Sequence, residues 1–152
     1  MQVVNDGSYD EYVRVKVRRS WTDADGSKNT VLDPELIELG ISSGWVEDTT
    51  DNTAEGDVYY YTSPLAIGGL AQFIETITIN NEVLTYVKTV DGDETGTVVN
   101  EYKYDGKSFY VEIDVDAVQA HNASDAILGA WGIDATVDDA GTITSINGKT
   151  VN

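Results

Sequence analysis

The sequence predicts an all-β protein, a jelly-roll-like antiparallel β-sandwich with one or two short helices. Three observations favour this class. Apolar and polar residues alternate with a period of two in several segments, turn residues separate these segments, and one stretch alone has a convincing helical period. A chain of 152 residues that is 41% hydrophobic can build one core, so we expect a single domain over residues 1–152.

The first strong strand pattern covers residues 12–18. Its valines fall on one face and its charged side chains on the other. A second clear pattern follows Asp105-Gly106, and in it every second residue from Phe109 to Val115 is apolar. We expect further strands near residues 58–61, 76–79, 83–90, 97–104, 135–137 and 142–146, and the strands at 83–90 and 97–104 form a hairpin around the turn at 91–96.

Two helices are expected. Asp33 followed by Pro34 is typical of a helix start, and Gly40 ends this short helix. The second helix is capped by Asn122 or Ser124 and ends at Gly132. The predicted core consists of inward-facing side chains from the two best strands and this helix: Val13, Val15, Val17, Phe109, Val111, Ile113 and Trp131.

The formal net charge of −18 argues against several partners. Nucleic acid and anionic lipid surfaces would be repelled by such a field, so neither is an expected partner. No apolar run approaches the ~20 residues that cross a bilayer, so we expect no membrane insertion of the mature chain. The charge is uneven, because residues 1–19 hold four of the nine basic residues and three of the 27 acidic ones.

No catalytic motif stands out, so we expect no enzyme activity and no catalytic residue. His121 is the single histidine, and cysteine is absent, which leaves no zinc site. Glu112, Asp114 and Asp116 share one strand face and could serve acid/base chemistry or bind Ca²⁺, but such a row is also typical of a solvated face. The sequence therefore predicts no cofactor, with Ca²⁺ as the one possibility left open.

The weak Ca²⁺ candidates lie in two acidic loops. They are Asp23 and Asp25 in the first loop, and Asp91 and Asp93 in the second. Neither loop has the register of a helix-loop-helix calcium site, and Asp and Gly are also ordinary turn residues. We expect affinity no tighter than the millimolar range.

Three segments together resemble the TasA/camelysin family of exported surface and biofilm-matrix fibre proteins, which carry a SipW-type signal peptide. Residues 4–17 (VNDGSYDEYVRVKV) are similar to its "N-x-G-x-x-D-x-Y-V-R-V-K" strand. Residues 59–65 (YYYTSPL) resemble its "Y-Y-x-x-P-L" segment, and residues 117–127 (AVQAHNASDAI), with Trp131-Gly132 after them, resemble its "A-V-Q-x-H-N-A-x-D-A-I" stretch.

The resemblance implies a jelly roll, an extracellular or cell-surface location, and filaments in which an extended N-terminal strand of one subunit completes the sheet of the next. It also implies that this chain is a mature fragment from which the signal peptide and first strand are missing. Partners would be other copies of the chain or related matrix subunits. Some relatives carry a metalloprotease label, which does not suit a chain with one histidine.

Two functions remain open. The first is a non-enzymatic filament subunit that assembles by β-strand addition, with an interface at Val4, Tyr12, Arg14, Lys16 and Arg18. In this hypothesis the basic strand is steered towards the acidic body of a neighbour. The alternative is a calcium-assisted glycan- or polymer-binding surface module, which uses acidic loops and exposed aromatic side chains. The tyrosines that suggest it are Tyr59, Tyr60, Tyr61, Tyr102, Tyr104 and Tyr110.

Overall fold

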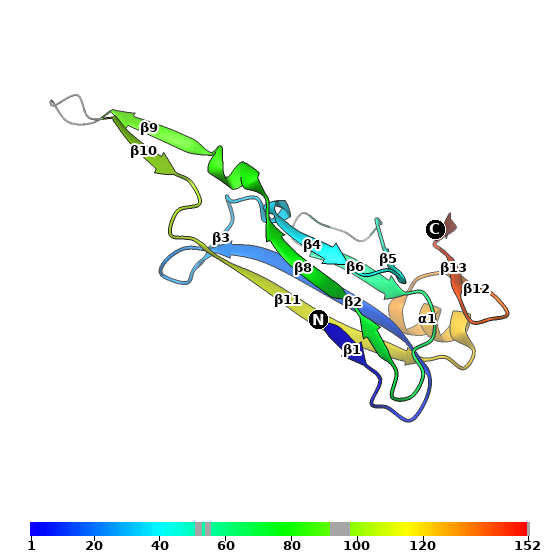
Figure 1. The fold of residues 1–152 in the computed structure, drawn as a ribbon. Coiled ribbons are helices and arrows are strands. Elements are labelled where there is room, and N and C mark those ends of the chain that lie inside the picture. The colour runs from blue at the N-terminus through cyan, green and yellow to red at the C-terminus, as the bar shows by residue number, and fades with distance from the viewer. Residues whose placement is uncertain (51–52, 54–55, 92–97, 152) are drawn as a thin grey trace.

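The chain folds into an all-β body from which a two-stranded arm projects (Figure 1). The computed structural model describes residues 1–50, 53, 56–91 and 98–151, and gives only the backbone for 88–91 and 98–100. The body is an antiparallel sandwich with a small helix at one end, and the arm leaves the opposite end. The sequence-based prediction of an all-β sandwich is confirmed.

The first layer is a sheet in which the strand order is β11-β2-β6-β5, with β3 paired to the end of β2. Its strands are β2 (Glu11–Thr22), β3 (Lys28–Asn29), β5 (Trp45–Glu47), β6 (Gly56–Tyr61) and β11 (Ser108–Gln119). β2 and β11 pair antiparallel over all 12 residues of each strand. This pairing extends along the whole length of both strands, and β11 lies at the edge of the sheet.

The second layer is built around one extended segment, residues 70–79. It consists of β1 (Gln2–Val4), β4 (Ile37–Ile41), β7 (Leu70–Gln72) and β8 (Ile74–Ile79). β1 pairs with β7 and β4 pairs with β8, and both pairings are antiparallel. Gly40 in β4 leaves room for the Thr76 hydroxyl across the pair, which a Cβ at this position would contact too closely.

The main core lies between these layers. Val13, Val15 and Val17 of β2 are buried there against side chains of the second layer, as their alternation predicted. Phe73, between β7 and β8, is fully buried and packs against Trp45 and Tyr59 with ring centroids 4.6 and 5.4 Å apart.

A second core covers the other face of the first sheet at one end. It is formed by α1 (Ala123–Trp131) and a C-terminal sheet of β12 (Ala135–Val137), β13 (Ile143–Ile146) and β14 (Lys149–Thr150). Tyr12 and Tyr60 are buried beneath these elements. Trp131 is half-buried in this cluster and lies 5.5 Å from the Tyr60 ring, so it is not part of the core between the layers.

The arm consists of β9 (Val87–Asp91) and β10 (Val98–Tyr102), which pair antiparallel as the predicted hairpin requires. The one-turn helix η2 (Asn81–Leu84) connects β8 to the arm. Among the described residues, no helix combines the length and apolarity that a membrane crossing needs.

Both helix predictions need correction in part. The helix after Asp33 is a single turn, η1 (Pro34–Leu36), and the chain then continues as β4. The Asp33 side chain does cap this turn by accepting from Glu35 N, but an apolar run of this length suits a strand equally well. Asn122 precedes α1, yet its left-handed backbone (φ 53°) leaves its side chain without a capping hydrogen bond. Ser124 lies inside the helix, whose C-terminal Gly132 is as predicted.

The predicted core is confirmed only in part on β11, where Val111 and Ile113 pack against the main core from its margin. Val111 and Ile113 are half-buried, and Phe109 keeps 40% of its surface exposed. These side chains do face inward, because they lie opposite inward-facing residues of β2. The core between the layers covers β11 only in part, because Val111 and Ile113 pack against it whereas Phe109 and Val115 stay exposed.

Candidate functional site

The edge strand β11 offers a candidate binding surface on the body. No other strand of the described chain pairs with its outer side. In an antiparallel strand, alternate residues direct their N–H and C=O groups away from the paired neighbour, so about six residues of β11 present free backbone groups. An edge of this length without a proline or a covering strand is a template for a further strand.

The inner face of β11 adds an apolar surface to this edge. Val115 lies directly opposite Val15, yet Val115 is 46% exposed whereas Val15 is fully buried. Ile113 and Phe109 lie on the same face, opposite Val17 and Trp21. The two layers therefore leave an uncovered apolar strip beside an unpaired backbone edge, which is the arrangement that strand addition uses.

The outer face of β2 and β11 is covered with ion pairs. Arg14 Nη2 lies 2.6 Å from Asp116 Oδ2, and Arg18 Nη2 lies 3.3 Å from Asp114 Oδ2. Lys16 Nζ is 4.0 Å from Asp116 Oδ2. The basic strand thus has its acidic partner strand within the same chain.

These pairs change the interpretation of the predicted interface. Tyr12 is 1% exposed and donates from its hydroxyl to the Gly141 carbonyl, so it has no surface to offer another subunit. Arg14 is also largely buried, and its guanidinium carbon lies 5.2 Å from the Trp131 ring centroid. Lys16 and Arg18 are more exposed, and Val4 is exposed on β1, which belongs to the other layer. The five residues do not form one patch.

The N-terminal segment is bound to its own body. Met1 donates its amino group to the Ile74 carbonyl at 2.6 Å, and β1 continues this pairing along β7. Buried Asn5 then donates through Nδ2 to the carbonyls of Tyr9 and Leu65, both at 2.8 Å. At three residues, β1 is too short for a periodic pattern to define it.

Arg19 forms a buried ion pair within the first sheet and also a hydrogen bond to the second layer. Arg19 Nη2 donates to Asp57 Oδ2 at 2.6 Å, and its Nη1 donates to the Ile37 carbonyl of β4 at 3.0 Å. Burial raises the pKa of Asp57 above its ordinary value, although the Arg19 charge acts in the opposite direction. Arg19 was not among the predicted site residues, and its position is structural.

The side chains of the Ca²⁺ candidates Asp23 and Asp25 already accept hydrogen bonds from other residues of the chain. Asp23 Oδ1 accepts from Lys107 Nζ at 2.7 Å and from Asn29 Nδ2 at 3.0 Å, and these bonds lower the pKa of Asp23. Asp25 Oδ1 accepts from the backbone and hydroxyl of Ser27, which lower its pKa in the same way. The Asp91 side chain and all of Asp93 lie outside the described residues.

The rest of the described chain offers no cluster of three or more histidine, aspartate or glutamate side chains that could hold a metal ion. His121 is exposed at the junction between β11 and α1. Glu112, Asp114 and Asp116 follow the outer face of β11, where the last two belong to the ion pairs with β2.

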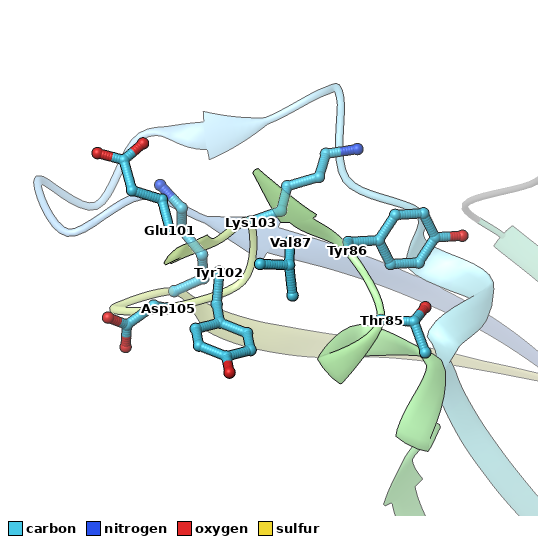
Figure 2. A pocket seen from close by; sticks show the side chains of 8 residues that line it. Thr85, Tyr86, Val87, Glu101, Tyr102, Lys103 and Asp105 are labelled. Carbon is cyan, nitrogen blue, oxygen red and sulfur yellow. The ribbon is translucent and has the colours of Figure 1, made fainter. Parts of the chain in front are cut away.

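A pocket lies where the arm joins the body (Figure 2). It encloses about 790 Å³ and is lined by Thr85, Tyr86, Val87, Glu101, Tyr102, Lys103, Asp105 and Lys107. Of the tyrosines that suggested glycan binding, Tyr102 is in this pocket, and Tyr104 packs behind it against Trp21 and Tyr86. Tyr59 and Tyr60 are buried in the two cores, and burial raises the pKa of each to about 12.

Comparisons with known proteins found no counterpart: no family model, no curated protein and no solved structure matches this chain.

Proposed function

We propose that this chain is a non-enzymatic structural protein that acts outside the cell as a subunit of surface or matrix filaments. Each subunit accepts an extended strand of a neighbouring copy, or of a related subunit, along β11. The observation that carries the proposal is the uncovered inner face of this edge strand, where Val115 is exposed beside a fully buried Val15.

Strand addition would satisfy both deficits of this edge at once. The backbone of an incoming strand would pair with the free N–H and C=O groups of β11, and its alternate side chains would cover Phe109, Ile113 and Val115. Burial of apolar area contributes roughly 25 cal/mol per Å², so this strip supplies affinity in addition to the backbone hydrogen bonds.

The donor strand must come from a segment that is free to leave its own subunit. The resemblance to the TasA/camelysin family suggests an N-terminal donor and a jelly-roll connectivity. Gln2–Val4 is already paired with β7, so a donor from this segment would exchange its own pairing for that of a neighbour. A strand upstream of residue 1 would need no such exchange.

A pair of lysine variants tests the proposal. Val115→Lys places a charge on the inner face of β11, whereas Tyr110→Lys places the same charge on the outer face of the same strand, where Tyr110 is 57% exposed. Both chains should fold, as judged by far-ultraviolet circular dichroism. We expect electron microscopy to show filaments for the parent chain, extended by any residues that naturally precede residue 1, and for the Tyr110 variant.

The Val115 variant of the same extended chain should remain monomeric by light scattering. Filaments that form equally well with Val115→Lys would show that β11 is not the acceptor. An extended parent chain that never polymerises would contradict the filament function itself.

A further inference from the structure

The pocket at the base of the arm has the size and composition of a ligand site. Its volume of about 790 Å³ lies within the range of roughly 300–1,000 Å³ that is usual for small-molecule sites. Tyr102 is 50% exposed at this concave surface. Figure 2 shows Tyr102 and Val87 pointing to the same side of the hairpin, between Asp105 and Thr85.

The walls of the pocket are held by the body, although the arm projects from it. The Tyr86 ring packs against Tyr104 with centroids 5.7 Å apart, and Tyr104 packs edge-on against buried Trp21 at 5.0 Å. Lys103 N donates to the Tyr86 carbonyl at 2.9 Å, which joins the two sides of the hairpin base. This row of three aromatic rings holds the Tyr86 wall of the pocket in place before any ligand arrives, which reduces the entropic cost of binding.

The polar groups around the pocket balance in charge. Glu101 and Asp105 supply carboxylates, and Lys103 and Lys107 supply ammonium groups. Lys107 is committed to Asp23, and Lys103 Nζ lies 5.3 Å from the centroid of the Tyr86 ring. The lining is thus close to neutral, although the whole chain carries a net charge of −18.

We infer that this pocket binds a neutral polysaccharide, with the Tyr102 ring as the platform on which a sugar ring stacks. The face of an aromatic ring is electron-rich and attracts the C–H groups of a sugar. The Asp105 carboxylate, which Figure 2 shows on the same side of the hairpin as Tyr102, accepts hydrogen bonds from sugar hydroxyls. This inference rests on a different part of the molecule from β11 and does not depend on filament assembly.

Other ligand classes fit less well. An anionic polymer would be repelled by the field of the chain, and Lys107 is already neutralised. A cation would compete with Lys103 for the Tyr86 ring. An apolar molecule would strip water from two carboxylates without offering them hydrogen bonds.

The experiment measures binding of the full chain to three neutral glucans, cellopentaose by calorimetry and laminarin and dextran by affinity electrophoresis, with alginate as the anionic comparison. We expect at least one glucan to bind and Tyr102→Ala to weaken this binding by about tenfold or more. Tyr102→Phe keeps the ring and should bind nearly as the parent does. Tyr110→Ala removes an equally exposed tyrosine outside the pocket and should leave binding unchanged.

Each of three results would overturn the inference: no binding of any neutral glucan, glucan binding that survives Tyr102→Ala, or binding of alginate alone. Circular dichroism on each variant confirms that a loss of binding is not a loss of fold.

Discussion

The matched valines Val15 and Val115 offer a quantitative test of the open edge. They lie directly opposite each other in the β2–β11 ladder and face the same side, but Val15 is fully buried and Val115 is 46% exposed. Val15→Ala removes the equivalent of two buried methylene groups, about 1.6 kcal/mol of transfer free energy, and leaves a cavity. We therefore expect it to lower the free energy of unfolding by roughly 2–3 kcal/mol.

Val115→Ala removes the same atoms from a half-covered position, so its cost should stay below about 1 kcal/mol. The assay is equilibrium urea denaturation followed by tryptophan fluorescence, at a concentration where light scattering shows monomers. Equal destabilisation by the two substitutions would mean that the inner face of β11 is covered in solution, and the argument for an acceptor edge would fail.

Three further predictions follow from the described contacts. The pKa of Tyr59 and of Tyr60 is raised from 10 to about 12, so both groups favour the folded state while they are protonated. The protein should therefore be most stable below pH 10 and lose stability as the pH rises through 12. Phenolate absorbance should appear together with unfolding. Asp57→Ala leaves the Arg19 guanidinium buried without its partner and should cost about 3 kcal/mol or more in urea denaturation, whereas a double replacement of both by leucine should restore much of that loss. Calcium titration by calorimetry should show nothing tighter than about millimolar affinity, and micromolar binding abolished by Asp91→Ala with Asp93→Ala would contradict this.

The alternation of apolar and polar residues predicted where strands lie, but it did not predict whether another layer covers each face of a strand. β2 and β11 have the same apolar period, and sequence alone assigned Val15 and Ile113 alike to the core. Burial depends on whether another layer reaches across the strand, which is a property of the whole chain. An edge strand with an exposed apolar face therefore has the same sequence pattern as a central strand whose apolar face is buried.

Local ambiguity explains the other differences. Residues 37–41 follow a genuine cap at Asp33, but five residues with three apolar positions fit a strand as well as a helix, and pairing with β8 decides the outcome. The bounds of β1 could not be predicted, because three residues carry no measurable period. The pocket could not be predicted either, because Tyr86 and Tyr102 come together only through the pairing of β9 with β10.

The basic residues of β2 form ion pairs within their own subunit, which argues against electrostatic steering of this strand towards a neighbour. Arg14 and Arg18 were expected to steer a basic strand towards an acidic neighbour, but they are paired with Asp116 and Asp114 of their own β11. What one copy presents to another is then mainly its net charge of −18, which is repulsive. Added salt shortens the screening length to about 8 Å at physiological ionic strength and should speed filament growth, because it weakens this repulsion. Time-resolved light scattering of the extended chain over a range of salt concentrations measures the effect. Growth that slows with added salt would contradict this prediction and support electrostatic steering between subunits.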